Sequence, residues 1–321
     1  MHTASQPVVT EVSGSTAQLQ RFCLGAAAGL SGLIRYRGMQ RFTWAMAPLF
    51  DSNNTAVLKL PSGGKLQIYL NDGYWARLLV PGFVYEPEIE LILRDVLTQP
   101  DTYFLDCGSN IGYWSVIASR VLPPGHTVAL EASPSSYEQL HRNAQLNEGR
   151  FDTVLGAIWS RDGDTLAIVT HDKRHAGSSV VNRREKTGQK GYHEYKIDSV
   201  TIDSICNRYI PDRNAKVVIK LDVEGAEMQA IEGAREVLSS REVVVIYEDH
   251  GQDTSCEISD LFINRLGFDV FFCDESGSIA RMNSIADVKN VKTSTSTGYN
   301  FSACSRNSTF SRILAARQRT T

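Results

Sequence analysis

Residues 103–112 read Tyr103-Phe104-Leu105-Asp106-Cys107-Gly108-Ser109-Asn110-Ile111-Gly112, and this stretch decides the fold. An apolar run ends in an acid, turns through two glycines and continues into another apolar stretch, which is typical of a β-strand, a tight turn and an α-helix. Glycines let a ligand approach the backbone closely. A second acid, Glu131, closes the next expected strand, where doubly wound sheets bind the two hydroxyls of a ribose. Together the two acids and the turn predict a bound nucleoside.

The spacing of the glycines indicates which nucleoside binds. A dinucleotide site needs glycine at the first, third and sixth positions of the turn, because the backbone must hold a pyrophosphate there. Those positions are Gly108, Asn110 and Tyr113 in this chain, so two of the three differ. An acid before the turn suits a ligand with a cationic amino acid tail, as S-adenosylmethionine has. The plainer alternative is a buried turn whose glycines only relieve backbone strain.

Composition is that of an ordinary globular enzyme. The 321 residues are 42% hydrophobic and 21% charged, enough for one large core and one or two domains. The net charge of −3 predicts no strong attraction to nucleic acid or to an anionic membrane. Six cysteines without a CxxC spacing predict reduced thiols rather than disulfides or a zinc site. The first twenty residues are mostly polar, which is unlike a signal peptide. We therefore expect a cytoplasmic protein without a membrane span.

The order of apolar and polar segments predicts the domain organisation. We expect a disordered tail over 1–20, a helix and hairpin extension over 21–80, the main domain over 81–306 with a lid-like insertion at 163–200, and a tail over 307–321. Within the main domain strands and helices alternate, which predicts a mostly parallel, doubly wound sheet. Four acids end its expected strands and should line one crevice: Asp106, Glu131, Asp222 and Glu248.

Three segments resemble the FkbM-type S-adenosylmethionine-dependent methyltransferases. They are the turn at 104–113, Glu131-Ala132-Ser133-Pro134, and Ile219-Lys220-Leu221-Asp222-Val223-Glu224-Gly225-Ala226-Glu227. The resemblance covers about residues 80–250. It implies a class I methyltransferase fold of Rossmann type, with a seven-stranded sheet whose last, antiparallel strand lies near 302–306. It also implies O-methylation of a hydroxyl on a sugar, glycan or polyketide-type molecule. Ser109 and Ala132 depart from the commoner Ala and Pro of the family, both at the pocket edge.

The resemblance assigns cofactor contacts to residues of this chain. Asp106, Gly108, Asn110 and Gly112 are expected at the methionine end, and Glu131 at the ribose. Ser133 is expected at the adenosine edge, Ala157 beside the adenine, and Tyr85 folded over the cofactor, although Tyr85 fits an ordinary helix entrance equally well.

Methyl transfer to a hydroxyl needs an aligned oxygen and a base to take its proton. Asp222 and Glu224 are the candidates, unless either only caps the helix that follows. His250 is a third candidate, because its titration range suits proton transfer. We expect no metal; the metal-dependent alternative would use Asp222, Asp249 and His250.

Other functions stay open at the level of sequence. A nicotinamide or nucleotide-sugar oxidoreductase shares the sheet but not the glycine spacing. A non-catalytic scaffold would be expected to lack the acids at the strand ends, and all four are present. A nucleic-acid methyltransferase would need a basic domain or a base-binding motif, and the chain shows neither. The acceptor and the oligomeric state are not encoded in any motif we recognise.

Overall fold

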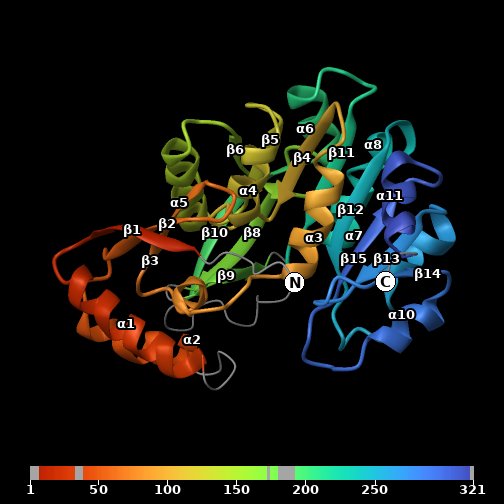
Figure 1. Ribbon diagram of the computed structural model, residues 1–321. Coiled ribbons are helices and arrows are strands. Elements are labelled where there is room, and N and C mark those ends of the chain that lie inside the picture. The colour runs from red at the N-terminus through yellow and green to blue at the C-terminus, as the bar shows by residue number, and fades with distance from the viewer. Residues whose placement is uncertain (1–6, 33–38, 172–173, 180–191, 319–321) are drawn as a thin grey trace.

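The computed structural model describes residues 7–32, 39–171, 174–179 and 192–318. Its centre is an eight-stranded sheet with helices on both faces (Figure 1). The order of the strands across this sheet is β14 (Ile279–Met282), β13 (Asp269–Cys273), β15 (Asn300–Cys304), β12 (Val243–Glu248), β11 (Lys216–Leu221), β4 (Thr102–Cys107), β5 (Thr127–Glu131) and β6 (Asp152–Leu155).

The sheet is mostly parallel, as predicted for a class I methyltransferase fold. Strands β12, β11, β4, β5 and β6 run parallel to one another. Strand β15 is antiparallel to both β12 and β13, and it begins at Asn300, slightly before the expected range. The sheet has eight strands where seven were expected, because β14 forms a hairpin with β13 at the edge.

Helices cover the two faces of the sheet and form two separate cores. One core includes Phe104 of β4 and the helices α3 (Pro87–Val96), α4 (Tyr113–Val121), α5 (Pro134–Leu146) and α11 (Thr309–Arg317). The other includes Leu105 and the helices α6 (Ile202–Tyr209), α7 (Glu227–Glu232), α8 (Arg235–Ser240), α9 (Glu257–Asp260), η4 (Leu261–Arg265) and α10 (Ile285–Val291). Neighbouring residues of one strand thus enter opposite cores, as the two-residue period of a strand requires.

The N-terminal extension is a small sheet with helices beside it. Strands β1 (Val8–Ser13), β2 (Thr55–Lys59) and β3 (Lys65–Tyr69) pair antiparallel, which confirms the predicted hairpin. The helices are α1 (Ala17–Gly32), α2 (Met39–Met46), η1 (Ala47–Leu49) and η2 (Trp75–Leu79). Our prediction of disorder over 1–20 is wrong for residues 8–20, because β1 pairs with a strand that lies more than forty residues later. In the described residues no helix is long and apolar enough to cross a bilayer.

The expected lid belongs to a third sheet. Its strands lie in the order β7 (Ala157–Ile158), β10 (Tyr192–Val200), β8 (Thr165–His171) and β9 (Arg174–Ser179). Strand β7 follows β6 directly along the chain, but β6 belongs to the main sheet and β7 to this one, with Gly156 between them. Residues 172–173 and 180–191 of the expected lid lie outside the described residues. Our prediction of a tail over 307–321 is wrong for residues 309–317, because these residues form α11, which buries Phe310 and Leu314 in the first core.

Candidate functional site

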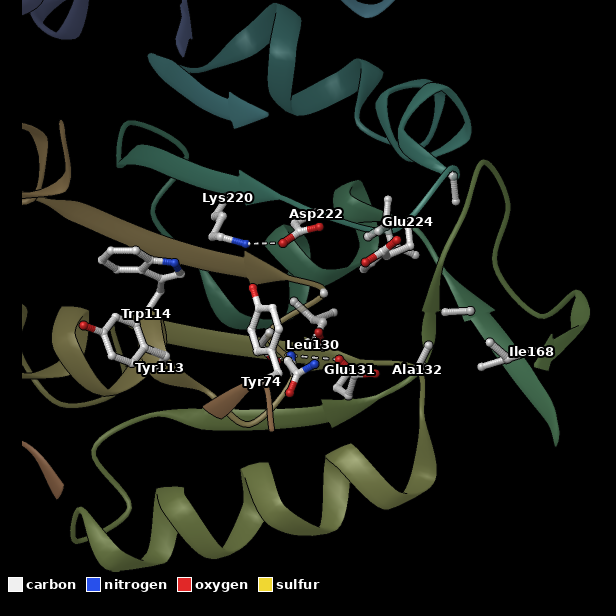
Figure 2. Close-up of a pocket in the computed structure, with 18 of the residues that line it drawn as sticks. Tyr74, Tyr113, Trp114, Leu130, Glu131, Ala132, Ile168, Lys220, Asp222 and Glu224 are labelled. Carbon is white, nitrogen blue, oxygen red and sulfur yellow. Dashed lines mark hydrogen bonds and ion pairs between the residues drawn. The ribbon is translucent and has the colours of Figure 1, made fainter. Parts of the chain in front are cut away.

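A pocket opens at the carboxyl ends of β4, β5 and β11 (Figure 2). The ends of these strands lie in register, since Cys107 of β4 faces both Leu130 of β5 and Leu221 of β11. The polar side chains that follow each strand are thereby brought to one edge of the sheet, which is where open α/β sheets bind their ligands. The lining residues are Tyr74, Trp75, Tyr85, Gly108, Ser109, Asn110, Tyr113, Trp114, Leu130, Glu131, Ala132, Gly156, Ala157, Ile158, Ile168, Lys220, Asp222, Val223, Glu224 and Ala226.

Glu131 forms the floor of the pocket and is held by backbone groups. The N–H of Asn110 donates to its Oε2 at 2.8 Å, and the N–H of Ser133 donates to its Oε1 at 2.7 Å. Burial raises the pKa of Glu131 to about 7, although both N–H groups act to lower it. Each carboxylate oxygen retains a further lone pair, so Glu131 can accept two more hydrogen bonds from a ligand such as a diol.

The glycine turn lies directly against the end of β11. A Cβ atom placed on Gly108 would sit 1.8 Å from the carbonyl oxygen of Asp222, and the φ of Gly108 is +79°. Only glycine fits both restrictions. The two motifs that predicted the site, around residues 106 and 222, are therefore in direct backbone contact.

Asp106 lies two residues deeper in the sheet than the other acids. It is buried and accepts a hydrogen bond from the Ser115 hydroxyl at 2.5 Å, and it does not line the pocket. Its Oδ1 atom is buried without a hydrogen-bond partner among the described residues. Burial raises the pKa of Asp106. We expected Asp106 to face the methionine end, but its side chain lies beneath the pocket and contacts Ser115 instead.

Lys220 is the cation of this site, and sequence reasoning gave it no role. It is 5% exposed, lies beside Asp106 across β4 and β11, and donates to Asp222 Oδ2 at 2.9 Å. Burial acts to lower the pKa of Lys220, but the charges of Asp222 and Asp106 outweigh this effect and raise it above the usual value. The pair fixes one oxygen of Asp222 at the pocket wall (Figure 2).

Two further carboxyl groups surround this pair. Burial raises the pKa of Glu86 to about 7, and Trp114 Nε1 donates to its Oε2 at 3.2 Å. Burial and the charge of Asp222 raise the pKa of Glu248, at the end of β12, to about 8. A cationic ligand group would stabilise the ionised form of these carboxyl groups, so the region suits cations better than anions.

Aromatic side chains form the opposite wall, and the sequence analysis missed all of them except Tyr85. The Tyr74 and Tyr85 hydroxyls are 2.8 Å apart, and Trp75 Nε1 donates to Asn110 Oδ1 at 3.1 Å. Tyr113 stacks on Trp75, with their ring centroids 5.9 Å apart. Tyr74 and Trp75 come from the N-terminal extension, so no local motif near the glycine turn could have revealed them.

The pocket brings together nine of the thirteen predicted site residues. These are Tyr85, Gly108, Ser109, Asn110, Glu131, Ala132, Ala157, Asp222 and Glu224. Of the others, Asp106 lies beneath the pocket, Ser133 contributes its backbone to Glu131, and Gly112 packs toward Leu140. His250 is exposed, 3.6 Å from Glu248 Oε1 and away from the lining.

The metal-dependent alternative is not supported by the positions of its residues. Asp249 accepts hydrogen bonds from Lys292 Nζ at 2.5 Å and from the Ser259 hydroxyl at 2.7 Å, both outside the pocket. Within the described ranges no group of three His, Cys, Asp or Glu side chains is arranged to hold a metal ion.

Comparison with known proteins identifies the family. The model of the methyltransferase FkbM domain matches residues 106–270, just over half of the chain. The chain belongs to the FkbM methyltransferase family. Its matched region contains the glycine turn, Glu131 and the Lys220–Asp222 pair, whereas the aromatic residues of the N-terminal extension lie outside it.

Curated relatives of this FkbM protein are distant. Methyltransferase 1 of Beauveria bassiana (strain ARSEF 2860) is 25% identical over 154 residues, which cover 43% of this chain and 61% of that protein. Methyltransferase sdnD of Sordaria araneosa is 25% identical over 178 residues, which cover 48% of this chain and 69% of that protein. The match thus spans about three fifths of the first relative. Among solved structures, the tRNA (uracil-54, C5)-methyltransferase of Pyrococcus abyssi in complex with S-adenosyl-L-homocysteine is 10% identical, with a TM-score of 0.39, and covers 78% of this chain and 44% of that chain.

Proposed function

We propose that this protein is an S-adenosylmethionine-dependent O-methyltransferase that acts on a hydroxyl of a sugar, glycan or polyketide-type small molecule. The observation that carries the proposal is the arrangement of one pocket. A buried glutamate able to accept a diol lies at one end, and an aspartate held by a buried lysine lies at the other. Family membership supports the methyltransferase reaction.

The residues present fit the cofactor. Glu131 would accept both ribose hydroxyls, and the turn at Gly108 and Asn110 would meet the methionine portion. Ala157, Ile158 and Ile168 give an apolar surface suited to adenine. The excess of carboxyl groups around Lys220 would favour a sulfonium and an ammonium group. When bound, the cofactor supplies an electrophilic methyl group.

Asp222 is our choice for the base that takes the proton from the acceptor hydroxyl. It lines the pocket at the end of β11, and Lys220 holds its Oδ2 so that the carboxylate keeps one orientation. Glu224, two residues later, also lines the pocket and is the second choice. His250 is the least favoured, because it does not reach the pocket lining. Replacing Asp222 by Asn should abolish turnover while S-adenosylhomocysteine still binds; full activity of that variant would exclude Asp222 as the base.

The first test is calorimetric titration of the purified protein with S-adenosylhomocysteine and, separately, with NAD. We expect micromolar affinity for S-adenosylhomocysteine, none for NAD, and loss of binding in Glu131→Ala. Glu138→Ala is the matched control, because Glu138 lies exposed on the neighbouring helix α5 with 73% of its side chain accessible. Binding of NAD in place of S-adenosylhomocysteine would favour the oxidoreductase. A screen of hydroxylated sugars and polyketides with labelled cofactor then tests the acceptor class.

A further inference from the structure

Helix α1 presents an apolar face to solvent. Its inner face is formed by Ala17, Gln20, Leu24 and Ala28, which are all buried. The outer face is formed by Leu19, Phe22, Ala26 and Gly29 at the same helical spacing, and all four are exposed. Phe22 is 75% exposed and Leu19 59% exposed. A soluble helix normally turns several charged residues toward water, whereas Arg21 is the only charged residue of α1.

Exposed apolar side chains gather in the N-terminal extension beyond α1. Eight large hydrophobic side chains are exposed in the described part of the chain, and five lie between residues 8 and 49. The start of α1 and the end of η1 are adjacent, since the N–H of Asp51 donates to the Thr16 hydroxyl at 3.2 Å. Leu49, which is 70% exposed, therefore lies at the same end of the extension as Leu19. Figure 1 shows α1 and α2 together at one end of the molecule, away from the main sheet.

The charge of this segment is opposite to that of the rest of the protein. Residues 12–50 contain four arginines and no lysine, aspartate or glutamate, so their net charge is +4. The remaining residues then carry 29 basic and 36 acidic side chains, a net charge of −7. Arg21 on α1 and Arg41 on α2 are both exposed. The small net charge of the whole chain conceals this asymmetry.

We propose that the exposed face of the N-terminal helices binds the surface of a membrane that contains anionic lipids. Apolar side chains that enter the interface, combined with arginines that meet lipid phosphates, are the two components of such binding. A second copy of the chain is a poorer partner, because a symmetric contact would bring Arg21 and Arg41 of both copies together, and α1 and α2 carry no acid to compensate them. The helices would lie on the membrane, since none of the described helices is able to cross it.

The position of this face links it to the pocket. Gly73 packs against α2, where a Cβ atom would meet the Gln40 carbonyl oxygen at 2.7 Å and Trp44 Nε1 at 2.8 Å. Tyr74 and Trp75, which line the pocket, follow directly. The surface-binding helices and the aromatic wall of the pocket thus share one short segment. Membrane binding itself does not depend on the proposed methyltransferase reaction.

Flotation with lipid vesicles tests the proposal. We expect the full-length protein to float with vesicles of equal phosphatidylcholine and phosphatidylserine and to remain unbound with phosphatidylcholine alone. The double variant Leu19→Ser with Phe22→Ser should lose binding. Changing both Arg21 and Arg41 to Glu should lower the affinity for vesicles by more than about fivefold per arginine. Removal of one basic side chain alone lowers such an affinity by about fivefold. The matched controls are Leu266→Ser, an exposed leucine of the main domain, and Arg235→Glu on α8.

The outcomes separate membrane binding from the other functions of the chain. Titration with S-adenosylhomocysteine should give the same affinity for all four variants, which shows that they fold and that the pocket is intact. Equal flotation of the helix variants and the controls would overturn the proposal, as would absence of flotation for the unmodified protein. Sedimentation that shows a dimer converted to a monomer by the double variant Leu19→Ser with Phe22→Ser would assign the face to a second copy and would also overturn the proposal.

Discussion

The ribose-binding role that we propose for Glu131 predicts that cofactor binding depends on pH. Its folded pKa is about 7, raised from 4.5 by burial, so the proton leaves only when pH rises through about 7. In this role only the ionised carboxylate accepts hydrogen bonds from both ribose hydroxyls. Below pH 7, where Glu131 is mostly protonated, cofactor binding must therefore displace its proton. We expect the affinity for S-adenosylhomocysteine to fall by up to about tenfold per pH unit below about 7. Titration at several pH values measures this; an affinity that is constant over that range would contradict it.

Lys220 stabilises the fold as well as the site. Replacing it by Met leaves Asp106 and Asp222 near each other without a cation, and unpaired buried charges are strongly destabilising. Because the side chain of Asp222 is 32% exposed, we expect a moderate loss of about 2–3 kcal/mol in the free energy of unfolding.

The loss at Lys220 has a definite pH dependence. The raised folded pKa of Lys220 means that its stabilisation is fully present at neutral pH. Without Lys220 the carboxyl groups are easier to protonate, so the deficit of the Met variant should shrink as pH falls. Urea unfolding at neutral and mildly acidic pH measures both effects, and adding Asp222→Asn should recover part of the loss. Equal stability of the Met variant and the unmodified protein would refute this role.

The turn between β4 and α4 is the element on which the pocket depends. In Gly108→Ala the new Cβ would lie 1.8 Å from the carbonyl oxygen of Asp222, which forces two strand ends apart. Gly125→Ala is a matched control, because Gly125 has nearly the same φ, +80°, but nothing within 4 Å of its Cβ. The control should lose only about 1 kcal/mol from backbone strain. We expect Gly108→Ala to lose about 3 kcal/mol or more and to lose S-adenosylhomocysteine binding. Similar thermal stability of the two variants would contradict the close contact.

Elements that depend on local sequence were predictable, and those that depend on distant contacts were not. The strands that end at Cys107, Glu131, Leu221 and Glu248 are apolar runs followed by turns, so pattern alone located them. Strand β1 is half polar and mostly exposed, and it exists through its pairing with β2, which pattern does not encode. Likewise Trp75 enters the site only because its extension folds onto the main domain.

At the scale of the whole molecule, the N-terminal extension and the main domain form one structure. The first core is continuous from Leu66 and Ile68 of β3 to Leu140 of α5. Buried amides reinforce this contact. Asn143 accepts from the N–H of Gln67 at 2.7 Å and donates to the Ile111 carbonyl at 2.8 Å. Residues matched by the family model and residues outside it should therefore unfold together.

Asn143→Ala tests this coupling. The substitution leaves the Gln67 N–H and the Ile111 carbonyl in a buried interface without their partner, and each such group costs about 1–3 kcal/mol. We expect a loss of about 2–4 kcal/mol, with circular dichroism and tryptophan fluorescence still reporting one coincident transition. Asn207→Ala, on the exposed side of α6, should change stability by less than about 0.5 kcal/mol. If tryptophan fluorescence changed at lower denaturant than circular dichroism, the extension would unfold separately. The aromatic wall of the pocket would then be able to detach while the sheet remained folded.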